Sequence, residues 1–199
     1  MLFLPECCTF IGRNAAETVA AARPLDTLLP RFAAIARDHN LWLSLGGVQE
    51  PGPDVDHIYN THVILDASGS LVATYRKVHL FNVDVPGGPL LMERNSTAAG
   101  DALVAVDVPA IHPLARIGLS ICYDLRFPEM YQALTWGMRA NVLTVPSAFT
   151  VATGRAHWEL LLRARAVECQ SFVVAAAQVW SLTIGCIDDD TQAVLMMIC

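Results

Sequence analysis

Three residues with chemically useful side chains follow apolar runs at widely separated points of the sequence: Glu6, Lys77 and Cys122. Attack on an amide carbonyl needs a thiolate, a base that generates it, and positive charge where the oxyanion develops. A cysteine, a glutamate and a lysine together supply these three functions. We therefore predict that Cys122 is a nucleophile, that Glu6 is its general base and acid, and that Lys77 stabilises the tetrahedral intermediate.

Each of these residues also has an ordinary structural interpretation. A lone cysteine at the end of a strand is most often structural, and a glutamate after a proline is ordinarily a helix cap or a surface residue. Spacing alone leaves both interpretations open, because perturbed groups also occur outside functional sites. The backbone N–H of Tyr123 follows Cys122 at a turn into a predicted helix, which makes it a candidate second donor to the oxyanion.

The elements that must position these residues alternate between strands and helices, which predicts an α/β fold with its site at the carboxyl ends of strands. An apolar run ends at Leu4, just before Glu6. A loop rich in Gly and Pro over 81–100 is long enough to be functional. Strands are predicted at 41–48, 59–66, 71–75, 116–121, 142–145 and 172–177, and helices at 27–39, 128–136 and 157–169.

Composition excludes several classes of protein. The chain has 199 residues, of which 54% are hydrophobic and 16% charged, enough to build the core of one domain. The net charge of −6 and the absence of a Lys/Arg run argue against a nucleic acid partner. No apolar stretch approaches the roughly 20 residues that span a membrane. Six cysteines lack metal-site spacing, so we predict no metal and reduced thiols in a cytoplasmic protein.

Both ends of the sequence depart from the pattern between them. Leu2 to Glu6 is typical of the last residues of a buried strand whose earlier part is absent. After Trp180 the pattern degrades, and three consecutive aspartates occupy 188–190. We expect a partial domain over 1–180 and an atypical tail over 181–199, in a chain that has lost its start and with it any organelle address. A short natural variant is the alternative.

The segments that carry the three reactive residues resemble signatures of the nitrilase superfamily of carbon–nitrogen hydrolases. The segment that follows Leu91 also resembles the part of the family that carries a second active-site glutamate, so the resemblance implies that Glu93 helps to position the substrate. The likeness runs from about Leu2 to Val179. The three signatures are Leu4–Glu6, Tyr75–Leu80 and, most specific of all, Gly118–Glu129.

This resemblance implies a four-layer α-β-β-α sandwich, incomplete at both ends, and an amidase that uses no cofactor or metal and forms a homodimer at full length. Further stretches, among them Phe10–Arg13, Pro146–Phe149 and Ala156–Glu159, are most similar to the amidases of deaminated glutathione. Such an enzyme hydrolyses the amide between a 2-oxoglutaryl-type acyl group and cysteinylglycine, a metabolite-repair reaction. The implied partner is therefore a small-molecule amide.

Several alternatives stay open at this point. An ω-amidase or another small-amide hydrolase of the superfamily would carry the same triad, and a catalytically inactive scaffold would keep the same fold. Arg126 either pairs with a carboxylate of the substrate or braces Glu129, and the bracing role is slightly preferred. Tyr123 and Phe149 either line the pocket or serve only in packing.

Overall fold

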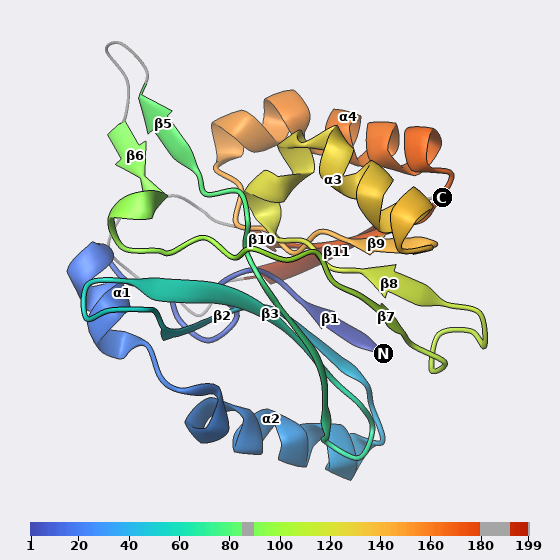
Figure 1. Cartoon of the computed structure of the whole chain (residues 1–199), viewed down its shortest axis with the longest axis horizontal. Coiled ribbons are helices and arrows are strands. Elements are labelled where there is room, and N and C mark those ends of the chain that lie inside the picture. Colours follow the sequence, from blue (N-terminus) through green and yellow to red (C-terminus); the bar gives the residue numbers. More distant parts are fainter. Residues whose placement is uncertain (85–89, 180–191, 199) are drawn as a thin grey trace.

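Two β-sheets face each other, and helices cover their outer sides, in a computed structural model that describes residues 1–84, 90–179 and 192–198. From one side to the other the layers are α2, the sheet β1–β4, the sheet β7–β11, and α3 with α4 (Figure 1). This arrangement confirms the predicted α/β class and its α-β-β-α layering. The predicted tail over 181–199 lies outside the described residues, except for the backbone of 192–198.

The first sheet has the strand order β1-β2-β3-β4, in which β1 is parallel to β2 and the other pairs are antiparallel. Its strands are β1 (Leu2–Leu4), β2 (Leu43–Pro51), β3 (Ile58–Leu65) and β4 (Leu71–Arg76). Helices α1 (Ala15–Ala21) and α2 (Leu25–His39) follow β1. Ala33 and Ala36 of α2 are buried against β2 and β3, whereas Ile35 is exposed.

The second sheet has the order β11-β10-β9-β8-β7, with parallel pairs in its centre and antiparallel pairs at both edges. Its strands are β7 (Ala105–Asp107), β8 (Arg116–Gly118), β9 (Val142–Thr144), β10 (Phe172–Val179) and β11 (Gln192–Ile198). Helix α3 (Pro128–Gln132), which continues as a π-turn to Gly137, and α4 (Val151–Cys169) cover it. Burial of Leu162 and Ala166 fixes the inner face of α4.

Two predicted elements differ from the structure. Helix α4 begins at Val151 rather than at 157, because the Thr150 side chain accepts from the backbone N–H of Thr153 and caps the first turn. The predicted loop over 81–100 contains a hairpin of β5 (Asn82–Asp84) and β6 (Leu90–Met92), followed by a 3₁₀ turn at Glu93–Asn95. Such short strands leave no alternation for a sequence pattern to reveal.

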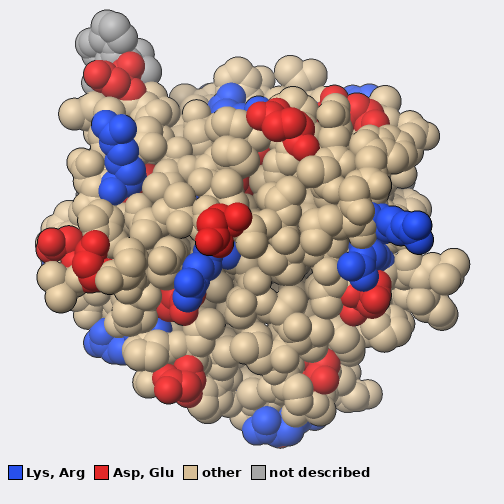
Figure 2. Space-filling view, in the orientation of Figure 1, with Lys and Arg blue, Asp and Glu red and all other residues tan. Residues whose placement is uncertain are grey.

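Charged side chains of both signs are interspersed on the face shown in Figure 2, without a cluster of one sign. An ion pair between exposed side chains contributes little to stability. The charges that matter for the fold are therefore the buried ones. Within the described ranges, no helix is long and apolar enough to cross a membrane.

A bulge in β2 lets three segments meet at one point. The register of β2 against β3 shifts between Leu45 and Val48, at Gly46 and Gly47. A Cβ atom on Gly46 would lie 2.2 Å from the carbonyl oxygen of Leu4 and 2.2 Å from Cβ of Pro146. Only glycine fits there, and it lets the end of β1 and the loop that contains Pro146 pack closely against β2.

Gly46→Ala is expected to lower the free energy of unfolding by about 1–3 kcal/mol, because the added Cβ must displace backbone rather than a flexible side chain. Urea denaturation at pH 7 measures the change. Gly137→Ala is the control, since a Cβ at Gly137 meets nothing within 4 Å. Equal midpoints for the two variants would contradict the close packing at Gly46.

A buried histidine joins the two sheets just before the predicted nucleophile. His62 Nδ1 lies 3.0 Å from the carbonyl oxygen of Ser120, so this nitrogen donates, and Nε2 lies 2.7 Å from Ser44 Oγ and accepts from it. Burial lowers the pKa of His62 to about 4, although the Ser120 carbonyl and the Asp124 charge oppose the shift. His62 is therefore neutral at pH 7 and fully bonded.

This depressed pKa predicts a loss of stability in acid. Between pH 6.5 and about 4 the unfolded chain binds a proton at His62 and the folded chain does not, so stability falls as the pH falls. Between pH 7 and pH 5 the expected loss from this group is about 2 kcal/mol. Urea denaturation of the wild type and of His62→Gln at both pH values measures it. An equal pH dependence in the two proteins would contradict the assignment.

Candidate active site

Glu6 lies two residues beyond β1 and is held in one orientation by donors from both sheets. Its Oε1 accepts from Asn60 Nδ2 at 2.9 Å and from Lys77 Nζ at 3.0 Å, and its Oε2 accepts from the N–H of Ala148 at 2.9 Å. Gln178 Nε2 donates to the Glu6 carbonyl oxygen at 3.1 Å. With only 5% of its surface exposed, Glu6 is a buried carboxylate whose charge is satisfied by fixed partners.

Lys77 directly follows β4, and its ammonium lies between two carboxylates. Nζ is 3.0 Å from Glu6 Oε1 and 3.0 Å from both carboxylate oxygens of Glu93. Burial acts to lower the pKa of Lys77, but the charges of Glu6 and Glu93 outweigh it and hold that pKa well above its ordinary value. The side chain therefore stays cationic in a site where it is almost fully enclosed.

Glu93 connects the ammonium to the hairpin of β5 and β6. It begins the 3₁₀ turn after β6, and its Oε2 also accepts from the N–H of Phe81 at 2.6 Å. The Glu93 N–H donates in turn to the Phe81 carbonyl at 3.1 Å. The structure thus brings Glu93 into direct contact with Lys77, whereas its expected role in positioning the substrate stays a prediction.

Cys122 begins the 3₁₀ turn Cys122–Arg126 with a φ of 47°, a left-handed conformation that costs on the order of 1–3 kcal/mol for such a residue. Its N–H donates to the carbonyl of Pro146 at 2.8 Å. Burial raises the pKa of the thiol and the Glu6 charge raises it further, against the opposing effects of Lys77 and of the N–H of Ala148. The resting thiol is therefore protonated and needs a base, and Glu6 is the adjacent one.

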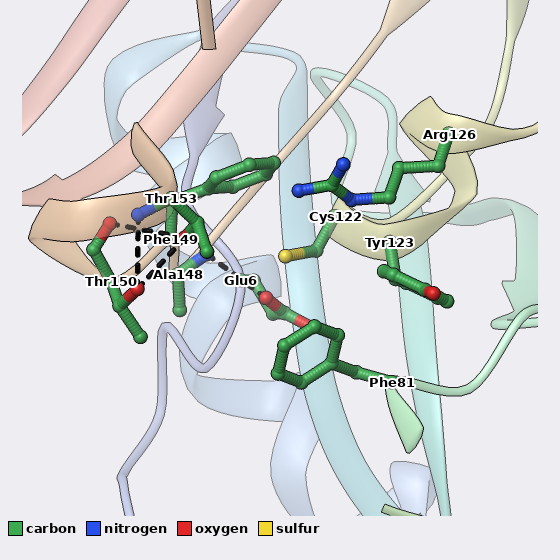
Figure 3. A pocket seen from close by; sticks show the side chains of 9 residues that line it. All are labelled: Glu6, Phe81, Cys122, Tyr123, Arg126, Ala148, Phe149, Thr150 and Thr153. Carbon is green, nitrogen blue, oxygen red and sulfur yellow. Dashed lines mark hydrogen bonds between the residues drawn. The ribbon is translucent and has the colours of Figure 1, made fainter. Parts of the chain in front are cut away.

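A pocket opens in front of the Cys122 sulfur (Figure 3). Five of the seven predicted site residues line it. Of the other two, Lys77 contacts Glu6 and Glu93 contacts Lys77. Sequence reasoning missed Phe81, Thr150 and Thr153, which come from the start of the hairpin segment and the first turn of α4. The lining residues are Glu6, Phe81, Cys122, Tyr123, Arg126, Ala148, Phe149, Thr150 and Thr153.

Arg126 extends into the pocket that Cys122 also lines (Figure 3). Among the described residues it forms no ion pair, and its guanidinium carbon lies 5.9 Å from the centre of the Tyr123 ring. The slightly preferred bracing role was therefore wrong. Phe149 lines the pocket and also packs edge-on against Trp158, with ring centres 5.0 Å apart. The N–H of Tyr123 is in the first turn of its 3₁₀ segment and has no partner within that segment.

Two hydrogen-bond donors to Glu6 were also not predicted: Asn60 and the backbone N–H of Ala148. Asn60 is 5% exposed and lies within β3, where asparagine is disfavoured, which was the available signal. The N–H of Ala148 reaches Glu6 only because the loop after β9 folds over it. Among the described residues, no three His, Cys, Asp or Glu side chains are grouped to hold a metal ion.

The chain belongs to the carbon–nitrogen hydrolase family, whose sequence profile matches residues 1–195. It is 50% identical over 182 residues to the deaminated glutathione amidases of Rattus norvegicus and Homo sapiens, a match that covers 89% of this chain and 54% of each relative. The crystal structure of the C. elegans NitFhit protein superposes with a TM-score of 0.79 at 45% identity, covering 96% of this chain and 45% of that one.

An amidase from Nesterenkonia sp. AN1, solved with acrylamide added to its active-site cysteine, superposes with a TM-score of 0.69 at 27% identity. That match covers 88% of this chain and 64% of the other. The chain thus spans about half the length of the curated relatives that it matches.

Proposed function

We propose that this protein is an amidase that hydrolyses a linear amide through a thioester on Cys122, and that its substrate is deaminated glutathione. The observation that carries the proposal is the contact of Glu6 with Lys77 at 3.0 Å beside the pocket into which Cys122 opens. The 50% identity to relatives named deaminated glutathione amidase supports the choice of substrate. The products would be 2-oxoglutarate and cysteinylglycine, in a metabolite-repair role.

In the first step the Glu6 carboxylate takes the proton of the Cys122 thiol as the sulfur attacks the amide carbon. The carbonyl π electrons move to oxygen, and the Lys77 ammonium and the Tyr123 N–H stabilise the resulting oxyanion. When the carbon–nitrogen bond breaks, Glu6 returns its proton to the departing nitrogen. The raised pKa of Cys122 supports this sequence, because a protonated thiol must be deprotonated before it can attack.

In the second step a water molecule attacks the thioester carbon and loses a proton to the Glu6 carboxylate. The carbon–sulfur bond then breaks, the acid product leaves, and Glu6 returns the proton to the Cys122 sulfur. One carboxylate thus serves twice as base and twice as acid. The three donors that fix Glu6 support this use, since a base that stays in place has little reorganisation to complete in each step.

Recognition of the substrate is assigned to the residues around the nucleophile. Arg126 is a cation in the pocket with no ionic partner among the described residues, so it suits the free carboxylate of the 2-oxoglutaryl group. Phe149 and Tyr123 supply apolar walls, and Glu93 holds Lys77 in position.

A kinetic comparison of deaminated glutathione with 2-oxoglutaramate tests the proposal. Both compounds leave the same acyl group on Cys122, so the ratio of their kcat/KM values reports only on the leaving group. We expect at least about a tenfold preference for deaminated glutathione, because cysteinylglycine offers more contacts than ammonia. Mass spectrometry of quenched reactions should find the acyl group on the Cys122 peptide. A preference for 2-oxoglutaramate would indicate an ω-amidase, and a thiol inert to both would indicate a scaffold.

A homodimer, a cytoplasmic location and a catalytic domain over 1–180 are parts of the same proposal. Exposed apolar side chains on the outer face of α4, Leu160 and Val167, support self-association and are tested by light scattering in solution. The described cysteines are free thiols, which fits a reducing compartment and is tested by cell fractionation.

A further inference from the structure

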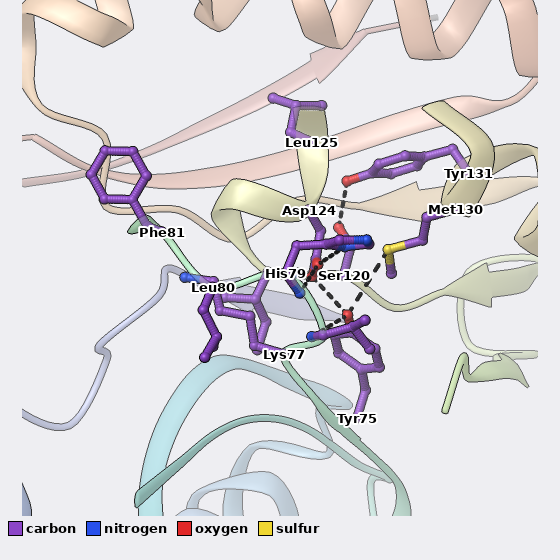
Figure 4. Close-up of polar contacts among 12 residues, drawn as sticks. Tyr75, Lys77, His79, Leu80, Phe81, Ser120, Asp124, Leu125, Met130 and Tyr131 are labelled. Carbon is purple, nitrogen blue, oxygen red and sulfur yellow. Dashed lines mark hydrogen bonds and ion pairs between the residues drawn. The ribbon is translucent and has the colours of Figure 1, made fainter. Parts of the chain in front are cut away.

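We propose that Asp124 is a positioning residue that fixes the Cys122 turn against the segment carrying Lys77; this inference rests on the proposed function. Asp124 is completely buried and accepts four hydrogen bonds (Figure 4). Its Oδ2 accepts from the hydroxyl of Tyr75 at 2.7 Å and from the N–H of Ile121 at 2.8 Å. Its Oδ1 accepts from the N–H of His79 at 3.0 Å and from His79 Nδ1 at 2.8 Å.

These four donors come from the two segments whose relative position the chemistry depends on. In the sequence, Tyr75 lies two residues before Lys77 and His79 lies two residues after it. The backbone hydrogen bonds of the described residues include none between 75–82 and 119–127. The hydrogen bonds that join the lysine segment to the nucleophile turn therefore run through the Asp124 carboxylate.

Contacts around the carboxylate make this connection rigid. The Tyr75 hydroxyl also accepts from the N–H of Val78 at 3.1 Å, so it ties the residue after Lys77 to Asp124. The His79 ring stacks on Phe127, the residue that ends the nucleophile turn, with ring centres 3.7 Å apart and planes inclined by 10°. The lysine segment thus touches both the middle and the end of the turn.

The strained conformation of Cys122 explains why such a clamp is needed. A left-handed φ at a residue with a side chain persists only where its surroundings determine it. Asp124 binds the N–H of Ile121 on one side of Cys122 and lies in the same turn on the other. Without these bonds the turn can relax, and the sulfur would move relative to Lys77 and Glu6.

Asp124→Asn tests the clamp at almost constant volume. Each carboxylate oxygen of Asp124 accepts from two donors, and an amide keeps only one such oxygen. In Asp124→Asn, two of the four donors therefore face the NH₂ group, which is itself a donor. We expect kcat for deaminated glutathione to fall about 100-fold, the cost of a displacement of about 1 Å at a reacting centre, with KM changed less than about threefold. Alkylation of Cys122 by iodoacetamide at pH 7 should slow in parallel, because the thiol loses its base.

Glu50→Gln is the matched control. Glu50 is another buried and paired carboxylate, bonded to Thr61 and Arg76 on the first sheet, without contact to the nucleophile turn. It should keep wild-type kcat and alkylation rate even where its unfolding midpoint drops. Wild-type kcat and alkylation in Asp124→Asn would overturn the positioning role, as would losses that are equal in Asp124→Asn and Glu50→Gln.

Tyr75→Phe provides a second variant should Asp124→Asn fail to fold. It removes one of the four donors, and kcat should fall by about tenfold with little change in KM. An unchanged kcat in this variant would overturn the proposal. If the wild-type chain alkylates at Cys122 and the variants alkylate more slowly, but no amide is hydrolysed, the proposed function fails and the positioning role of Asp124 stands.

Discussion

Cys122→Ala is expected to abolish amide hydrolysis, with kcat lowered by at least about 10⁴-fold, and to leave the protein folded. In the proposed mechanism the Cys122 thiol, which lies in the pocket, is the group that forms the covalent bond to the acyl carbon. The substitution removes one sulfur atom and leaves the hydrogen bonds of Glu6, Lys77 and Asp124 in place, so the fold should be kept. Steady-state kinetics with deaminated glutathione and a urea unfolding curve measure the two effects.

Cys169→Ala serves as the control for loss of a buried thiol, since Cys169 lies on the inner face of α4 and lines no part of the pocket. Its activity should match that of the wild type. Cys122→Gly adds a test of the backbone: glycine adopts a φ of 47° without strain, so this variant should be more stable than Cys122→Ala. Residual turnover in Cys122→Ala at the wild-type rate would refute the nucleophile.

Lys77→Met is expected to destabilise the fold by about 3–5 kcal/mol and to lower kcat by about 10²- to 10³-fold. The stability loss arises because the buried Glu6 and the half-buried Glu93 lose the ammonium that lies 3.0 Å from each. The catalytic loss arises because the proposed oxyanion loses its cation. Urea denaturation at pH 7 and steady-state kinetics measure both effects.

The double variant Lys77→Met/Glu93→Gln separates the two effects. Removing one of the two uncompensated charges should recover part of the stability and none of the activity. The pKa of Lys77 is raised in the folded state, so its stabilising contribution is present below the ordinary lysine pKa of about 10.4 and is lost as the pH rises through the folded value. Above a pH of about 10.4, the free energy of unfolding of Lys77→Met should therefore depend less on pH than that of the wild type.

The sequence was sufficient to predict the elements with strong patterns and the residues with reactive groups. The apolar periodicity of α2 and the runs of β2, β3 and β10 are long enough to define an element, and the structure has each within a few residues of its predicted bounds. Glu6, Lys77, Glu93 and Cys122 were identified because their segments resemble a family and their chemistry fits one reaction. The structure brings the first three into direct contact.

What could not be predicted depends on contacts between distant segments. The hairpin of β5 and β6 has three residues in each strand, too few for a period to be visible. The N–H of Ala148 has no side chain that could mark it, and its role follows only from the 2.9 Å contact with Glu6. For Arg126 the sequence left two roles open, with bracing of Glu129 slightly preferred, because the sequence does not show which way the side chain extends; the structure has Arg126 line the pocket.

The contacts of Glu6 have a consequence for biosynthesis. This residue is oriented by Ala148 and Gln178, which are 142 and 172 positions further along the chain. At a translation rate of about 5–20 residues per second, roughly 7–34 seconds pass between the synthesis of Glu6 and that of these partners. A nascent polypeptide carries the complete Cys122 segment before these contacts orient Glu6, so the proposed amide cleavage can begin only once the newly made protein has closed its two sheets together.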